Sequence, residues 1–496
     1  MTTRRSFLVG SAAAAALARF PAKSWSQSIA STPELVLSVD AKRKLATMPL
    51  NFTGLSYETA QLGHPEYFST SNKSLIALIR GLGKQGVLRI GGSTSDFTTW
   101  SENDADAVQN DSPAVIGPVG YNSGVKYKPT TILTPAAIRN LNRFSEAVGW
   151  PVLYGLNLKR GTAENAVAEA KFVAATLGSQ LVAFQLGNEP DHDYVPESMS
   201  SKPLPSVSLS FDQYYDRWLK FHDSIRQAVP TARFAGPDTA GHYEWLAKLV
   251  EKRADMDFFS AHFYAEGPPS NPEMNLEFLL HRGRLEGGSN IALVQQAIAA
   301  SGKPFRLTEG NSCYSGGKAG VSDTVASALW SADFMLQLAQ AGYSGVNLHG
   351  GGTGYYTPIA NSLEQGYSAR PVYYGMLLAE RFVGSSLVAT SLSAQTPAQN
   401  VTGFAAVYEG GWKLALFNKA PEPVKIKIEG LGATPAKGEV TLLQGKQIDA
   451  REGVTFGGST VAPDGAFSPK PESQILVQKG EASIEVAAYS AAYIQI

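Results

Sequence analysis

The stretch VAFQLGNEP, residues 182–190, combines a short apolar run with a polar turn. Its first five residues fit a parallel strand, because such strands are covered by helices on both faces and are apolar throughout. The run ends at Leu186, and Gly187, Asn188 and Glu189 follow it. A second stretch, FRLTEGN at residues 305–311, repeats the pattern with Glu309 after its apolar run. Both stretches predict a strand that carries a glutamate just past its carboxyl end.

Similar short apolar runs recur along the chain, and longer helical patterns separate them. The eight strand candidates are 52–55, 87–90, 152–156, 182–186, 233–235, 258–263, 305–308 and 345–348. The helical patterns cover 73–83, 135–148, 164–176, 211–228, 243–252, 291–300 and 322–341. This alternation predicts an α/β fold, a (β/α)₈ TIM barrel. An open doubly wound sheet is the alternative, but no glycine-rich phosphate loop follows the first strand.

After about residue 385 the segments become short, rich in β-formers and separated by turn residues. This pattern of short strands and turns is typical of an antiparallel β-sandwich. The segment 34–39 also fits a strand, and a lone strand cannot bury itself, so we expect it to join the sandwich. The predicted organisation is 29–48 for the N-terminal sandwich strand, 49–383 for the barrel and 384–496 for the sandwich domain.

The N-terminus, MTTRRSFLVGSAAAAALA at residues 1–18, joins an arginine pair to a short apolar run of small residues. It resembles a twin-arginine signal, which exports proteins already folded. An amphipathic helix is the alternative, but the segment has no polar face. We expect residues 1–28 to be removed and the mature protein to be periplasmic or secreted from a bacterium.

Composition excludes several classes of protein. The chain has 496 residues, 44% of them hydrophobic, and a formal net charge of -1. A near-neutral chain does not bind nucleic acid through its overall field, and no run of apolar residues is long enough to span a membrane. The single Cys313 excludes a disulfide framework and a cysteine-based zinc site, and we expect it to pack rather than react. The seven histidines form no HExxH pattern, so we predict neither metal nor cofactor.

The reactive groups of a barrel enzyme lie just after the carboxyl ends of its strands. Glu189 and Glu309 would therefore face each other across the barrel mouth. Such a pair suits glycoside hydrolysis, in which one carboxyl protonates the leaving oxygen and the other attacks the anomeric carbon. An amide at Asn188 could bind a sugar 2-hydroxyl, and Glu58, after the first strand, could bind hydroxyls on the non-reducing side. The alternative for any single glutamate is a surface or ion-paired residue.

Asn-Glu after the fourth strand and Glu after the seventh resemble the clan A retaining glycosidases. Several features resemble glycoside hydrolase family 79, the β-glucuronidase and heparanase-like family, over almost the whole mature chain. The resemblance implies a double displacement with Glu189 as acid/base and Glu309 as nucleophile. It also implies carboxyl groups ~5–5.5 Å apart.

The residues after the predicted nucleophile, Glu309, indicate which sugar the protein would bind. In the family, the amides of a Gly-Gly pair and a tyrosine hydroxyl hold the C6 carboxylate of glucuronic acid. Gly316, Gly317 and Tyr314 match this pattern, and Tyr356, after the eighth strand, matches a second tyrosine of the family. Consecutive amides of a glycine turn can bind an anion without a basic side chain. A flexible loop and packed tyrosines are the alternatives.

Other strand ends supply supporting residues by the same resemblance. Arg89, in an Arg-x-Gly-Gly segment that continues to Ser93, would hold Glu309 through a charge-assisted hydrogen bond. Ser93 would contact the substrate. Tyr264 would hydrogen-bond the nucleophile and His262 would line the pocket. Ion pairing elsewhere for Arg89 and core packing for His262 are the alternatives.

The predicted partner is a glycan or glycoside that contains glucuronic acid. Near-neutral charge favours exo-action slightly over heparanase-like endo-action, and the segment 191–210 could wall the cleft or line it. A clan A glycosidase for arabinofuranosides or xylosides would need the same two glutamates but not the carboxylate-binding set. A non-catalytic carbohydrate-binding barrel would gain little from two costly carboxylates. The sequence leaves the aglycone, any 4-O-methyl preference and the oligomeric state open.

Overall fold

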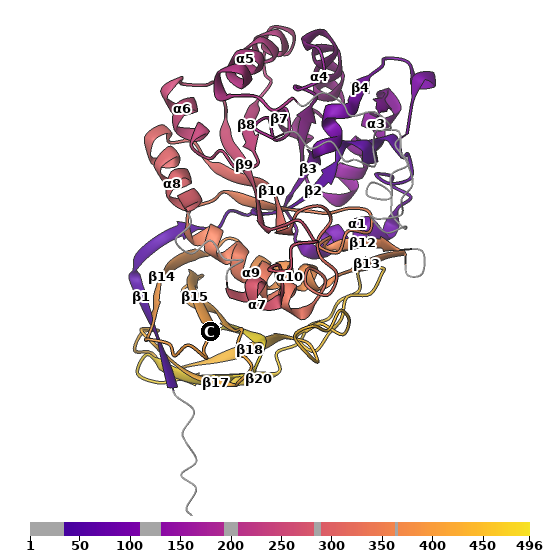
Figure 1. Ribbon diagram of the computed structural model, residues 1–496. Coiled ribbons are helices and arrows are strands. Elements are labelled where there is room, and N and C mark those ends of the chain that lie inside the picture. The colour runs from indigo at the N-terminus through magenta and orange to yellow at the C-terminus, as the bar shows by residue number, and fades with distance from the viewer. Residues whose placement is uncertain (1–33, 110–129, 193–206, 282–288, 363–365) are drawn as a thin grey trace, which may run out of the picture.

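The computed structural model describes residues 34–109, 130–192, 207–281, 289–362 and 366–496. The predicted signal segment, residues 1–28, lies outside them. Figure 1 shows a barrel of strands and helices above a curved sheet, with α9 and α10 between them. Among the described helices, none is long and apolar enough to cross a membrane.

Eight strands form a closed barrel in the order β10-β11-β2-β3-β6-β7-β8-β9, and every neighbouring pair is parallel. All eight predicted strands are present and the barrel is confirmed, so the open doubly wound sheet is excluded. Their bounds are β2 (Thr53–Glu58), β3 (Val87–Gly91), β6 (Val152–Leu156), β7 (Leu181–Leu186), β8 (Phe234–Thr239), β9 (Phe258–Glu266), β10 (Phe305–Cys313) and β11 (Gly345–His349). The strands β8, β9 and β10 run further than predicted, because polar residues that face the mouth continue the ladder.

The helices around the barrel follow the predicted patterns. They are α1 (Lys73–Leu82), α3 (Pro135–Val148), α4 (Ala163–Leu177), α5 (Phe211–Ala228), α6 (Trp245–Glu251), α8 (Ser289–Ser301) and α9 (Val325–Gln340). The sequence analysis missed α7 (Leu276–His281) and α10 (Pro371–Glu380). All of α10 from Pro371 to Ala379 is buried, so it lacks the polar stripe by which a surface helix is recognised.

Short elements shape the rim of the barrel. Two 3-10 turns follow the first two barrel strands, η1 (Thr59–Gly63) and η2 (Ser93–Phe97), and η3 (Asp104–Asp106) follows β4 (Thr98–Trp100). A fourth, η4 (Gly178–Gln180), lies at the opposite end of the barrel, between α4 and β7. Two small sheets complete the rim, β4 with β5 (Thr131–Leu133), and β12 (Ile359–Ser362) with β13 (Gly366–Ala369).

The second unit is one ten-stranded sheet rather than two separate sheets. It contains β1 (Glu34–Thr47), β14 (Ser386–Leu392), β15 (Val401–Tyr408), β16 (Gly411–Asn418), β17 (Val424–Glu429), β18 (Ala436–Gln444), β19 (Thr455–Phe456), β20 (Ser473–Val477), β21 (Glu481–Val486) and β22 (Ser490–Gln495). As predicted, the N-terminal strand joins it: β1 runs antiparallel to β14 and parallel to β17. The sheet curves over itself, since Ile426 of β17, Ile475 of β20 and Leu414 of β16 share one buried cluster.

The two faces of this sheet belong to different cores. On β16, Leu414 and Leu416 lie in the sheet's own cluster, whereas Ala415 and Phe417 lie in the large cluster that contains the barrel and its helices. Side chains point to opposite faces at successive positions of a strand. One face of the sheet therefore covers the sheet's own core, and the other packs on α9 and α10. The seam between the barrel and the sheet is thus mainly apolar.

Candidate active site

A cavity of about 390 Å³ opens at the carboxyl-terminal mouth of the barrel. Its walls include nine of the predicted residues: Glu58, Ser93, Asn188, Glu189, Tyr264, Glu309, Tyr314, Gly316 and Tyr356. They also include four residues that the sequence analysis did not single out: His192, Ala240, Ser315 and His349. Arg89, His262 and Gly317 are not part of the wall, and the buried Arg89 and His262 support it from behind.

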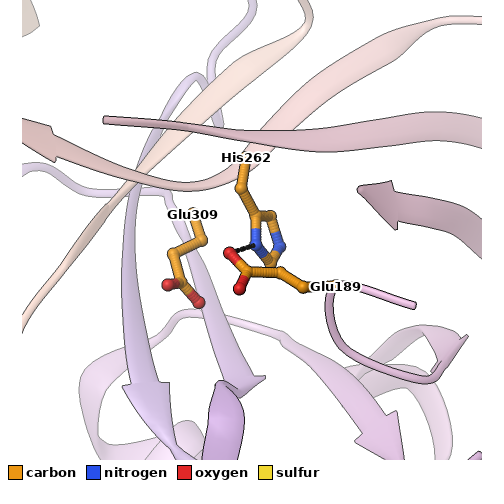
Figure 2. Close-up of side chains that lie close together, drawn as sticks. All are labelled: Glu189, His262 and Glu309. Carbon is orange, nitrogen blue, oxygen red and sulfur yellow. Dashed lines mark hydrogen bonds and ion pairs between the residues drawn. The ribbon is translucent and has the colours of Figure 1, made fainter. Parts of the chain in front are cut away.

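The two glutamates meet in this cavity. A carboxylate oxygen of Glu189, a ring nitrogen of His262 and a carboxylate oxygen of Glu309 all lie within 4.8 Å of one another. Figure 2 shows both carboxylates beside the imidazole, which reaches Glu189 through a hydrogen bond of 2.9 Å. This spacing suits a retaining glycosidase, whose carboxyl groups are ~5–5.5 Å apart, better than an inverting one.

Glu309 lies in an environment that keeps it ionised. It accepts hydrogen bonds from Arg89 and, at 2.7 Å, from the Tyr264 hydroxyl. His349 Nδ1 stands 3.6 Å from its Oε2. Burial is the largest single influence and by itself would raise the pKa of Glu309. The charges of His349, His262 and Arg89 together overcome it and hold that pKa well below its usual range.

Arg89 joins Glu309 to the rest of the mouth. The guanidinium is fully buried and also donates to Ser56 Oγ at 3.1 Å, Gln185 Oε1 at 3.1 Å and Asp238 Oδ2 at 3.2 Å. A further bond of 2.7 Å goes to Asn188 Oδ1. Because the amide oxygen of Asn188 is engaged, this side chain offers the cavity its N–H donors.

Glu189 is held by its backbone as much as by its side chain. Its φ of 43° lies in the left-handed region, which costs energy for a residue with a Cβ. The Glu189 amide donates to the Asp238 carbonyl at 2.9 Å, and the ammonium of the buried Lys159 donates to the Glu189 carbonyl at 3.2 Å. Lys159 also donates to His192 O at 2.8 Å. These bonds fix the turn that aims the carboxylate into the cavity.

His262 is a cation between the two glutamates. Burial opposes its charge, but Glu309, Asp238 and Glu189 more than compensate and raise the pKa of His262 to about 10. Glu189, His262 and Glu309 form a cluster with the geometry of a metal site, and in this structure they are engaged by one another and by Arg89.

A further carboxylate and a second histidine flank Glu309. Glu58 Oε2 accepts from the amide and the hydroxyl of Thr94, at 2.9 Å and 2.6 Å. Its Oε1 lies 3.4 Å from His349 Nε2. Burial opposes the charge of His349, yet Glu309 and Glu58 raise its pKa. His349 thus links Glu58 to Glu309.

His349 and Asp238 were not predicted as site residues, although each lies at a strand end. His349 is the last residue of β11, where the same rule that selected Glu309 applies. Asp238 lies in β8, which was predicted to stop at residue 235. Gly236 and Pro237 interrupt the apolar run before it, so no sequence signal extended that strand.

The predicted carboxylate-binding loop lies against the loop that follows β11. Ser315, Gly316 and Gly317 have φ values of 57°, 86° and 84°, which favours glycine at the last two positions. A Cβ on Gly317 would stand 2.7 Å from the Tyr356 amide. The Tyr314 ring is 40% exposed at the cavity. The predicted glycines and tyrosines are thus brought together at one side of the cavity.

Cys313 lies beneath this loop and is buried. Burial raises the pKa of its thiol to about 11, with Lys318 opposing the shift. A protonated, buried thiol is a poor nucleophile, which agrees with the predicted packing role.

Comparisons with known proteins agree with the predicted resemblance. The chain is 24% identical over 395 residues to a β-glucuronidase of Neurospora crassa, an alignment that covers 71% of this chain and 68% of the relative. It is also 24% identical over 371 residues to a β-glucuronidase of Aspergillus niger, covering 68% and 65%. The similarity to β-glucuronidases inferred from the motifs is therefore confirmed. No protein-family model matches the chain.

Solved structures share the architecture. A 4-O-α-L-rhamnosyl-β-D-glucuronidase of Fusarium oxysporum superposes with a TM-score of 0.71 at 18% identity, covering 94% of this chain and 99% of that one. An α-L-arabinofuranosidase of Thermotoga maritima superposes with a TM-score of 0.64 at 17% identity, covering 93% and 100%. At this identity the likeness shows the fold, a (β/α)₈ barrel with an attached sheet.

Proposed function

We propose that this protein is a retaining glycoside hydrolase of family 79 that cleaves β-D-glucuronides. The observation that carries the proposal is the pair of carboxylates, Glu189 and Glu309, with oxygens within 4.8 Å at the barrel mouth. The sequence likeness to two β-glucuronidases supports the choice of substrate.

In the first step Glu309 attacks the anomeric carbon. Its ion pair with Arg89 and its bond from Tyr264 keep the carboxylate charged and aimed. The bond from carbon to the glycosidic oxygen breaks, and Glu189 gives its proton to that oxygen. A covalent glycosyl-enzyme remains, with Glu309 esterified.

In the second step the ester is hydrolysed. Glu189, now a carboxylate, takes a proton from water, the water oxygen attacks the anomeric carbon, and the bond to Glu309 breaks. His262 holds the Glu189 carboxyl in place through its 2.9 Å hydrogen bond. Two inversions return the β-configuration.

The substrate assignment is a separate part of the proposal. Tyr314, Gly316, Gly317 and Tyr356 bind the C6 carboxylate, while Asn188 donates to the 2-hydroxyl. Glu58 and Ser93 contact hydroxyls on the non-reducing side. All but Gly317 line the cavity, which supports these roles.

The remaining proposals concern the whole chain. We propose exo-action, which the near-neutral charge favours, although most of the predicted wall segment 191–210 lies outside the described residues. We further propose a twin-arginine signal at 1–28, export to the periplasm or medium, a barrel domain at 49–383 and a sheet domain formed by 29–48 and 384–496.

The first experiment is hydrolysis of p-nitrophenyl β-D-glucuronide by the purified mature protein. The matching β-glucoside, β-xyloside and α-L-arabinofuranoside are assayed in parallel, with Glu309→Gln as the control. We expect release from the glucuronide alone, a loss in Glu309→Gln of more than about a thousandfold, and a β-product by NMR. Preferred release from a neutral glycoside would refute the carboxylate-binding set but leave the glutamate pair intact. An α-product would refute the double displacement.

A further inference from the structure

A second and larger cavity, about 1000 Å³, lies on the seam between the barrel and the C-terminal sheet. Barrel residues Asp323, Arg370 and Tyr374 form one side, and Arg451, Glu452 and Thr460 of the sheet domain form the other. None of them belongs to the catalytic mouth described above.

The Asp323 carboxylate lies near two guanidinium groups in this cavity but forms hydrogen bonds with only one of them. Arg451 donates to Asp323 Oδ2 through Nε at 2.6 Å and contacts the same oxygen through Nη2. The nearest nitrogen of Arg370 stands 3.8 Å from that oxygen, beyond hydrogen-bond distance. The Arg370 side chain is only 22% exposed and makes no hydrogen bond to any other residue that the structure describes.

The guanidinium of Arg370 is therefore both poorly solvated and poorly paired. Burial lowers the pKa of Arg370, and the neighbouring charge of Arg451 adds to this, while Asp323 opposes it. An anion bound in the cavity would relieve both effects through charge-assisted hydrogen bonds. Asp449 and Glu452 also line the cavity, but both are exposed, where water and salt screen their charges.

The same two loops shape this cavity and the catalytic one. Tyr356 lines the catalytic cavity, while its neighbour Tyr355 is 36% exposed and lies 5.8 Å from the Arg451 guanidinium. The loop of Gly316 continues to Gly320, whose amide donates to Asp323 Oδ1 at 2.7 Å. The segments 316–323 and 355–356 therefore join residues of the catalytic cavity to the surroundings of Arg451 and Asp323.

We propose that the seam cavity is a second saccharide subsite, which binds an anionic group of a glucuronate-containing chain whose end occupies the catalytic cavity. Arg370 is its principal ligand, and the anion is a uronate carboxylate or a sulfate. The inference rests on the proposed glucuronidase function, since it assigns a longer substrate to the same site.

Kinetics on a short and a long substrate test the subsite. Arg370→Gln should hydrolyse p-nitrophenyl β-D-glucuronide as the wild type does, because this substrate does not reach the seam. For a hyaluronan tetrasaccharide with a glucuronate at its non-reducing end, we expect KM to rise about tenfold and the effect to fade at high salt. Arg233→Gln is the matched control, since Arg233 precedes β8 at the opposite end of the barrel. An equal KM for Arg370→Gln and wild type would overturn the proposal.

Binding in a Glu309→Gln background separates this inference from the proposed activity. Calorimetry compares the hyaluronan tetrasaccharide, a sulfated chondroitin tetrasaccharide and neutral xylotetraose. Weaker binding of either anionic chain after Arg370→Gln, with xylotetraose unaffected, supports the subsite even if the wild type hydrolyses no glucuronide. The chain that loses more affinity identifies carboxylate or sulfate as the ligand. Equal losses for all three chains, or none, would refute it.

Discussion

Charges of opposite sign alternate at the barrel mouth, and each supports a neighbour. Arg89 lies between Glu309 and Asp238, and His262 lies between Asp238 and Glu189. No carboxylate in this chain of contacts is buried without a cation, which limits the cost of burial. The same arrangement gives the two glutamates different surroundings, because Glu309 has an arginine and a tyrosine as donors while Glu189 has the imidazole. Different surroundings are what allow two like groups to perform different roles.

Lys159 acts on the reaction through the turn of Glu189. Its ammonium donates to the Glu189 and His192 carbonyls and pairs with Asp96 at 2.8 Å. In Lys159→Met we expect the acid/base to be misaimed, so kcat/KM for methyl β-D-glucuronide falls about a hundredfold. The p-nitrophenyl substrate, whose leaving group needs little protonation, should lose far less.

The measurement for Lys159 is the dependence of log kcat/KM on leaving-group pKa, which should steepen. Lys159→Met combined with Asp96→Asn is the control, since it also removes the buried carboxylate that loses its ion pair with Lys159 in the single variant. An equal loss on all leaving groups would mean that Lys159 only stabilises the fold.

Local sequence predicts most of the elements that position the site. Glu189 and Glu309 could be placed because each follows a short, largely apolar strand, whereas Arg89 lies within β3 and was placed by the family resemblance. Asp238 could not, since glycine and proline break the run before it. Likewise the buried α10 shows no amphipathic period, and the seam cavity depends on contacts between Asp323 and Arg451, which are far apart in the chain. The features that could not be predicted depend on tertiary packing, whereas those that could be predicted follow from local sequence preference.

The helix α4 carries a buried carboxyl, Glu169, that pairs with no cation among the residues the structure describes. Glu169 faces β6 and contacts the Tyr154 hydroxyl at 2.7 Å, and burial raises its pKa to about 7, although the Tyr154 bond opposes this. The folded state therefore holds a proton that the unfolded chain loses near pH 4.5. The contribution of Glu169 to the unfolding free energy is greatest below pH 4.5. It decreases as the pH rises to about 7 and does not change further above that pH.

Glu169→Gln replaces the protonated carboxyl with a neutral amide. We expect the variant to exceed the wild type in unfolding free energy at pH 8 by at most about 3 kcal/mol. The two proteins should differ little at pH 4.5. Urea unfolding at both pH values is the measurement, and a gain that is the same at both would contradict the assignment of this proton.

The barrel and the sheet share buried apolar contacts across their seam, and we therefore expect them to unfold as one unit. One buried cluster runs from the barrel strands through α9 and α10 to the outer face of the sheet, and β1 returns the N-terminal part of the chain to that sheet. The seam also brings Arg451 to the loops of the catalytic mouth. The sheet therefore contributes to the surroundings of the site as well as to stability.

Lys419 and Asp333 form an ion pair inside this seam, and each side chain is 1% exposed. Lys419→Met would leave Asp333 without its buried cation, at a cost of about 3–5 kcal/mol in unfolding free energy. Because the seam is continuous, we expect wild type and variant each to melt in one calorimetric transition, with the variant at lower temperature. Adding Asp333→Leu should recover much of the loss, since two apolar side chains replace the pair. Two separate transitions in the Lys419→Met variant would instead mean that the barrel and the sheet fold independently and that the pair only docks them.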